Sequence, residues 1–144
     1  MNAIGLALTA VLAAIAGLHA IWAARIWWPV RDEAALARTI AGFRGIDRMP
    51  GMLPSVAVAA AVLASLLLVA DLSWASGLTH LPAWVVRSAS ALAGLVFLGR
   101  GVIGFTPFWA KLTPEEPFRT LDRRYYSPLC ILIGLGFAGL IWSN

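Results

Sequence analysis

Residues 52–70 read MLPSVAVAAAVLASLLLVA, an apolar run that contains no charged residue. About 20 helical residues cross a hydrocarbon core that is about 30 Å thick. Lipid favours a helix because a helix satisfies the hydrogen bonds of its own backbone. This run therefore predicts a transmembrane helix that ends before Asp71.

Three further apolar runs of similar length cover residues 3–24, 83–105 and 126–142. The seven tryptophans all lie near the predicted helix ends, at the headgroup level that the indole ring prefers. Hydrophobic residues make up 60% and charged residues 12% of the chain, whereas soluble chains contain about 45–50% and about 25%. Residues 1–144 are therefore predicted to form one all-α integral membrane domain, a four-helix transmembrane bundle with short interfacial helices in the cytoplasmic connections.

The Lys and Arg residues predict the orientation of these helices. They gather in the first and third connections and their edges, at Arg25, Arg31, Arg38, Arg44, Arg48, Lys111, Arg119, Arg123 and Arg124. The second connection has only Arg87 at its edge. Because positive residues stay inside, the first and third connections are expected to be cytoplasmic and both termini outside, in the inner (plasma) membrane. The net charge of +4 then suits anionic membrane lipids, and nucleic acid is not expected as a partner.

Both cytoplasmic connections carry helix signals. In the first, Leu36, Ile40 and Phe43 follow helical spacing, which predicts a short amphipathic helix on the membrane surface. In the third, Thr113, Pro114 and Glu116 read as an N-cap, a proline at the first helical position and the end of a capping box.

Small residues indicate where helices approach one another. Cys130, Gly134 and Ala138 form a stripe at four-residue spacing, and Ala13 with Gly17 forms a shorter one. Such stripes allow close contact between transmembrane helices. Packing within the bundle and a homodimer face both remain open as interpretations.

Arg100 lies well inside the third apolar run. A charge at the bilayer centre costs about 2.5–3.5 kcal/mol on insertion scales, so Arg100 needs a partner or an aqueous route. It precedes Trp109 by nine residues, which places it roughly 13 Å below that interface. His19 precedes Arg25 by six residues, so we expect it at a similar depth on the same cytoplasmic side.

Asp122, Tyr126 and Ser127 lie at the cytoplasmic entrance to the fourth run. Together with His19 and Arg100 they predict a polar pocket that opens inward, with an ion pair between Arg100 and Asp122. A structural network that satisfies its own buried groups is the alternative interpretation.

Other motif matches carry no function. Residues 99–104 read GRGVIG, but this match to the dinucleotide fingerprint lies in a transmembrane run and follows no strand. His80 and Asp71 make a poor metal site without further ligands, and Cys130 is the only cysteine. Neither a cofactor nor a metal ion is predicted.

Residues 118–130 read FRTLDRRYYSPLC. This stretch resembles the signature of a bacterial membrane family known as domain of unknown function 3995, as do LHAIW at 18–22 and FLGR at 97–100. The resemblance implies a four-helix membrane protein and implies no activity. It contains all candidate ligand-binding residues, namely His19, Trp22, Arg100, Asp122, Tyr126 and Ser127.

Three functions remain open at this point. The first, which we predict, is binding or transport of a lipid or small molecule at the polar pocket, with transport favouring a homo-oligomer. The second is a membrane-embedded enzyme that acts on a lipid or isoprenoid headgroup, with Arg100 holding an anion and His19 or Asp122 handling a proton. The third is an accessory subunit of a larger membrane complex.

Overall fold

The computed structural model describes residues 3–74 and 77–143, and within them every regular element is a helix, with no strand. The elements are α1 (Ala3–Ala23), α2 (Glu33–Ile40), α3 (Met52–Trp74), α4 (Ala83–Ile103), α5 (Pro107–Leu112), α6 (Phe118–Leu121), the π-helical turn η1 (Asp122–Tyr126) and α7 (Ser127–Ser143). The predicted all-α class is confirmed.

Four helices are long and apolar enough to cross a membrane, namely α1, α3, α4 and the continuous helix Phe118–Ser143 formed by α6, η1 and α7. The chain is therefore a multi-pass membrane protein. The fourth helix begins eight residues before the predicted start at 126, because the π-helical turn continues α6 directly into α7. Tyr126 consequently lies inside a helix instead of opening one.

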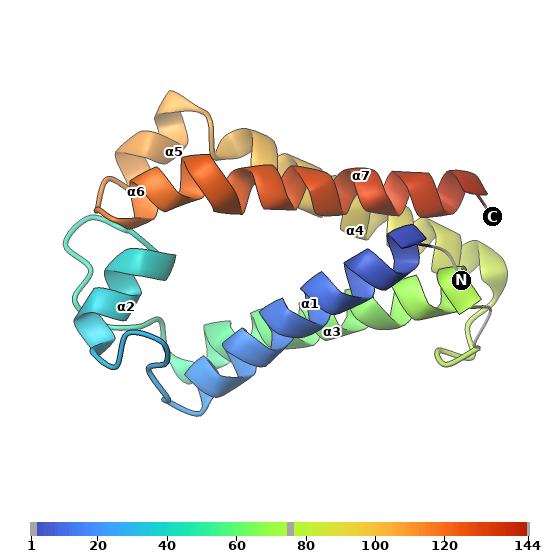
Figure 1. Cartoon of the computed structure of the whole chain (residues 1–144), viewed down its shortest axis with the longest axis horizontal. Coiled ribbons are helices and arrows are strands. Elements are labelled where there is room, and N and C mark those ends of the chain that lie inside the picture. The colour runs from blue at the N-terminus through green and yellow to red at the C-terminus, as the bar shows by residue number, and fades with distance from the viewer. Residues whose placement is uncertain (1–2, 75–76, 144) are drawn as a thin grey trace.

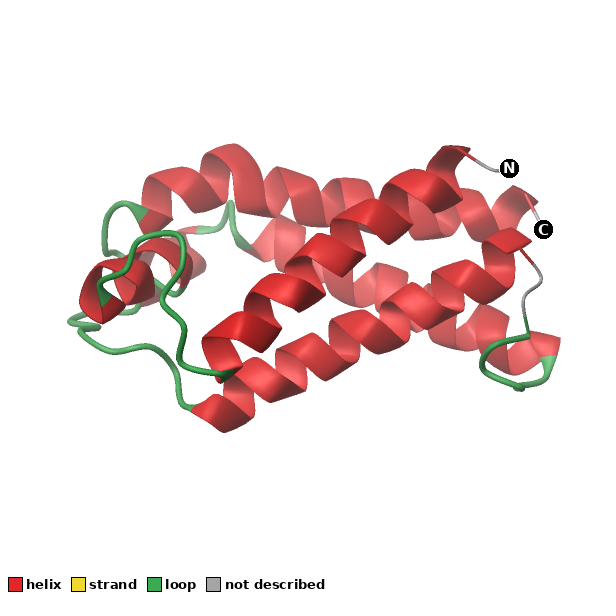
Figure 2. Cartoon of the chain, turned by 60° about the horizontal axis from the view of Figure 1, so that its bottom comes forward, coloured by secondary structure: helices red, strands yellow, loops and turns green. Residues whose placement is uncertain are grey.

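The long helices form two antiparallel pairs, α1 with α3 and α4 with α7. The pairs lie close together at the end that holds the two termini and spread apart toward the short helices (Figure 1). Figure 2 shows the same arrangement from another side, with both termini opposite α2, α5 and α6. The main apolar core joins the pairs, and its buried members are Leu8, Leu12, Val62, Val69, Leu72, Val86, Ile133, Phe137 and Leu140.

The first connection contains a helix, α2, as predicted. The apolar face of α2 packs against other residues of the chain instead of lying on the membrane surface. Leu36 is 1% exposed and lies in a cluster with Trp22 and Met49. Phe43 lies beyond the helix and is 42% exposed, so it does not extend the predicted stripe. The helix ends early because Gly42 adopts a left-handed φ of 63°, a conformation that glycine allows at no steric cost.

The predicted helix start in the third connection is wrong. The helix α5 begins before the predicted start, with Thr106 as its N-cap, whose hydroxyl accepts a hydrogen bond from the Trp109 N–H (3.2 Å). The helix α6 begins after it, at Phe118. Thr113 closes α5 instead, and its hydroxyl donates to the Trp109 carbonyl (2.8 Å). Glu115 turns away to the first connection, where its carboxylate accepts a hydrogen bond from the Gly45 N–H (2.9 Å).

The small residues of the fourth helix serve the packing of α7 on α4. A Cβ atom added at Gly134 would lie 2.8 Å from the Gly94 carbonyl oxygen, so the two backbones approach closely there. A Cβ added at Gly17 would meet nothing within 4 Å, and Ala13 is exposed. Gly134 of the α7 stripe thus packs within the bundle, whereas Ala138 of the same stripe and Ala13 of the α1 stripe are exposed.

Candidate functional site

The polar site is built where α4 meets η1 and the start of α7. Glycines on α4 make this approach possible: a Cβ at Gly101 would lie 2.8 Å from the Ser127 carbonyl oxygen. A Cβ at Gly104 would overlap the Ser127 hydroxyl and lie 3.0 Å from Asp122 Oδ2. Gly101 and Gly104 of the GRGVIG segment therefore allow a neighbouring helix to approach closely. Gly99 has no such role, because a Cβ added there would meet nothing within 4 Å.

The π-helical turn η1 brings Asp122 and Ser127 to the same helix. In an α-helix, residues five apart lie about 140° apart around the axis. Here the Ser127 N–H bonds to the Asp122 carbonyl across the wider turn, which places the two residues one turn apart. Both side chains therefore face α4, and both are buried.

Arg100 and Asp122 form the ion pair that the sequence predicts. Arg100 Nη2 lies 2.6 Å from Asp122 Oδ1, and Arg100 Nη1 donates to the Ser127 hydroxyl at 3.3 Å. The Asp122 side chain is 2% exposed, whereas that of Arg100 is 30% exposed. Removing one partner of a buried ion pair costs about 3–5 kcal/mol, because the remaining charge has no compensation.

Trp109 completes the cluster and was missed by the sequence reasoning. Its indole N–H donates to Asp122 Oδ2 at 3.0 Å, and Arg100 Cζ lies 4.8 Å from its ring centroid. A cation over an indole face is attracted by the ring quadrupole. The sequence signal for this arrangement is the N-cap pair Thr106–Pro107, which starts α5 and folds Trp109 back over α4. The position of Trp109 near a predicted helix end indicated only a headgroup anchor.

A cavity of about 380 Å³ opens beside Asp122. It lies between the end of α4, α5 and α6, and its lining residues are Gly104, Phe105, Thr106, Pro107, Trp109, Ala110, Lys111, Thr113, Arg119, Asp122 and Arg123. We call this cavity the basic pocket because three of its lining residues are cations. Asp122, the one acid among the described residues that line it, already accepts hydrogen bonds at both oxygens.

Tyr126 lies beside this cluster but serves a different contact. Its hydroxyl donates to the Thr39 carbonyl of α2 at 3.2 Å, and its ring packs against that of Phe118. Tyr126 is not among the residues that line the basic pocket. It therefore ties the fourth helix to the first connection.

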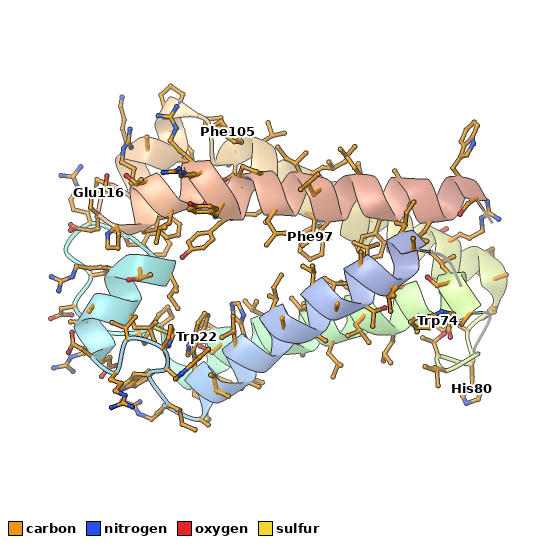
Figure 3. The ribbon with its side chains drawn as sticks, viewed as in Figure 1. Trp22, Trp74, His80, Phe97, Phe105 and Glu116 are labelled. Carbon is orange, nitrogen blue, oxygen red and sulfur yellow. The ribbon has the colours of Figure 1, made fainter. Side chains whose placement is uncertain are left out.

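His19 and Trp22 lie on the other helix pair. His19 Nδ1 is 2.9 Å from the Ile15 carbonyl oxygen, and its ring meets Trp22 edge-on. The Trp22 indole donates to the Trp28 carbonyl (2.9 Å). Figure 3 labels Trp22, which packs with Leu36 and Ala37 of α2. Within residues 3–74 and 77–143, neither residue forms a hydrogen bond or ring contact with Arg100 or Asp122, because the two pairs spread apart at this level.

Metal-ligating side chains do not cluster in the described part of the chain. No group of three or more His, Cys, Asp or Glu residues there could hold a metal ion. The donors and acceptors that do converge, a guanidinium, a carboxylate, a hydroxyl and an indole, satisfy one another. The site can therefore fix two helices and present the neighbouring cations to a ligand.

Two antiparallel pairs of apolar helices, with polar contacts and short helices gathered at one end, define a small multi-pass membrane protein. Residues 12–137 match the family described as "Protein of unknown function (DUF3995)", and the chain belongs to this family. This confirms the resemblance seen in the sequence. No curated protein and no solved structure matches the chain.

Proposed function

We propose that the protein binds an anionic, phosphate-bearing headgroup in the basic pocket, at the cytoplasmic face of the inner membrane. The observation that carries this proposal is the charge of the pocket. Lys111, Arg119 and Arg123 line it, and the carboxylate of Asp122 is already neutralised by Arg100. The pocket thus offers an excess of positive charge.

The cations of the basic pocket differ in their freedom to meet a ligand. Arg119 donates to the Ala110 carbonyl at 3.0 Å, which holds it along the wall of the pocket. Lys111 and Arg123 are exposed, so they are available to an incoming anion. Each Lys or Arg near an anionic membrane surface contributes about 1 kcal/mol of attraction, which supports an anionic lipid headgroup as the ligand.

The Arg100–Asp122 pair supports the same proposal as a positioning device. It joins the end of α4 to η1, and Trp109 joins α5 to the same carboxylate. The walls of the basic pocket are thereby held together before any ligand arrives, and such preorganisation lowers the free-energy cost of binding. Because both oxygens of Asp122 already accept hydrogen bonds, binding is better supported than proton transfer by this residue.

The proposal includes the orientation of the bundle, with the end that carries α2, α5 and α6 on the cytoplasmic side. The end of the bundle that carries α2, α5 and α6 also carries most of the Lys and Arg residues. Positive residues remain on the cytoplasmic side during insertion. The basic pocket then faces the leaflet surface at which anionic headgroups carry a negative potential.

Binding to the purified protein in mild detergent tests this function. Two probes separate the sources of the phosphate: glycerol phosphate, which is a headgroup without chains, is followed by calorimetry, and phosphatidylglycerol by native mass spectrometry. The double variant Lys111→Gln/Arg123→Gln is expected to weaken binding about tenfold or more, because two charge-assisted contacts are lost. Binding of the lipid alone would identify a membrane lipid, and binding of both would identify the headgroup.

Arg124→Gln is the matched control. Arg124 is exposed, follows Arg123 in the chain and lies 5.6 Å from the Tyr125 ring centroid, outside the lining of the basic pocket. We expect it to retain the affinity of the wild type. Equal affinity of all three proteins for both probes, or loss of affinity in Arg124→Gln alone, would overturn the proposal.

A further inference from the structure

A second hollow lies on the same helix pair, at the end that holds the termini. It is a groove of about 590 Å³ between α4 and α7, lined by Arg87, Ala91, Gly94, Leu95, Leu98, Gly134, Phe137, Ala138, Ile141 and Trp142. The exposed alanines Ala91 and Ala138 leave this space open to the surroundings. We call it the outer groove.

Arg87 is the one charged residue among those that line the outer groove in the described part of the chain. It is exposed, and its Nη2 donates to the Ile141 carbonyl near the end of α7 at 3.3 Å. This bond holds the guanidinium at the mouth of the groove. A guanidinium has five N–H donors, so Arg87 can also bind a phosphate oxygen there.

The length of the outer groove fits one leaflet. Arg87 and Leu98 are eleven residues apart on α4, which corresponds to about 16 Å along a helix axis. Half of a hydrocarbon core is about 15 Å. The groove therefore runs from the headgroup level, where Trp142 is 93% exposed, to the middle of the membrane.

We infer that the outer groove holds one acyl chain of an anionic phospholipid, whose phosphate binds Arg87. A cation at the interface and an apolar channel one leaflet long match the two parts of such a lipid. A helix of a second copy would pack along the full thickness of the membrane and would meet an uncompensated cation at this end. The inference is independent of the proposed function, because the basic pocket lies at the opposite end of α4.

Phosphatidylglycerol binding, measured by native mass spectrometry in the Lys111→Gln/Arg123→Gln background, tests this inference. That background weakens the basic pocket as a competing site. We expect one retained lipid for each chain, with dioleoyl phosphatidylglycerol preferred over dioleoyl phosphatidylcholine. Adding Arg87→Gln should weaken retention about tenfold, because a charge-assisted hydrogen bond is lost.

Ala138→Leu narrows the outer groove without removing the cation. Ala138 is exposed, so the bundle accommodates the larger side chain, and retention should again fall about tenfold. Ala13→Leu, at an exposed alanine of α1, is the matched control and should retain the lipid. Unchanged retention in both Arg87→Gln and Ala138→Leu would overturn the inference, as would a lipid-free dimer that Ala138→Leu dissociates.

Discussion

The two helix pairs satisfy their polar side chains in different ways. On α1 and α3, Ser65 donates to the Ala61 carbonyl and His19 meets the Ile15 carbonyl, each one turn back on its own helix. On α4 and α7, Arg100 bonds across to Asp122 and Ser127. A hydroxyl or imidazole in lipid can use its own helix, whereas a guanidinium needs a neighbouring helix that carries a counter-charge.

The two helix pairs therefore differ in whether polar contacts determine which helices meet. The α1–α3 pair is held by apolar contacts, so its polar residues do not determine its partner. In the α4–α7 pair, the ion pair and the close approach at Gly101 and Gly104 determine which helices meet. Substitutions of hydrogen-bonding side chains should therefore have larger effects on α4–α7 than on α1–α3. Glycine substitutions do not divide in this way, because a Cβ at Gly5 of α1 would overlap the Ser73 side chain of α3.

The largest effect is expected for Asp122→Ala, which leaves Arg100 without its counter-charge. Unfolding of the purified protein in detergent should show a loss of about 3–5 kcal/mol in the free energy of unfolding. Arg100→Met combined with Asp122→Leu removes both charges and should recover most of that loss, because an apolar pair of similar volume is often neutral. Wild-type stability of Asp122→Ala would contradict the role assigned to the ion pair.

An intermediate effect is expected for Gly104→Ala. The added Cβ would overlap the Ser127 hydroxyl, and overpacking of this kind costs about 1–3 kcal/mol. Gly99→Ala is the control on the same helix, since nothing lies within 4 Å of its Cβ position, and it should be neutral or stabilising. Thermal unfolding of the two variants measures the contrast, and similar melting temperatures would show that α7 is not packed against Gly104.

The smallest effects are expected from two serine substitutions that compare the pairs directly. Ser127→Ala removes a bond to Arg100 and should cost about 1 kcal/mol. Ser65→Ala removes only a bond to the Ala61 carbonyl of its own helix and should stay within about 0.5 kcal/mol of the wild type. Unfolding in denaturant measures the loss in the free energy of unfolding for each variant. A larger loss in Ser65→Ala than in Ser127→Ala would contradict the comparison between the two helix pairs.

Sequence reasoning succeeded wherever lipid acts on a single helix. Hydropathy and the tryptophans located the four long helices to within a few residues at most ends, because the bilayer imposes length and composition on each one separately. The depth of Arg100 followed from its distance to the interface. The pairing with Asp122 could also be predicted, since few counter-charges lie near that depth.

Lateral position was the part that sequence could not provide. His19 and Arg100 were assigned a similar depth, yet they lie on different helix pairs, because depth along the membrane normal contains no information about neighbours. The start of α5 was missed for another reason. Thr113–Pro114 and Thr106–Pro107 carry similar local signals, and the bonds of Glu115 to the first connection decide between them.

The spacing between Arg100 and Asp122 has a consequence for biogenesis. The two residues are 22 positions apart, so the cation leaves the ribosome before its counter-charge does. During that interval α4 is a costly segment to transfer into lipid alone, whereas α1 contains no Asp, Glu, Lys or Arg and the Asp71 carboxylate of α3 lies near the end of its helix. The translation order therefore favours entry of α4 and α7 into the bilayer together, as one helical hairpin.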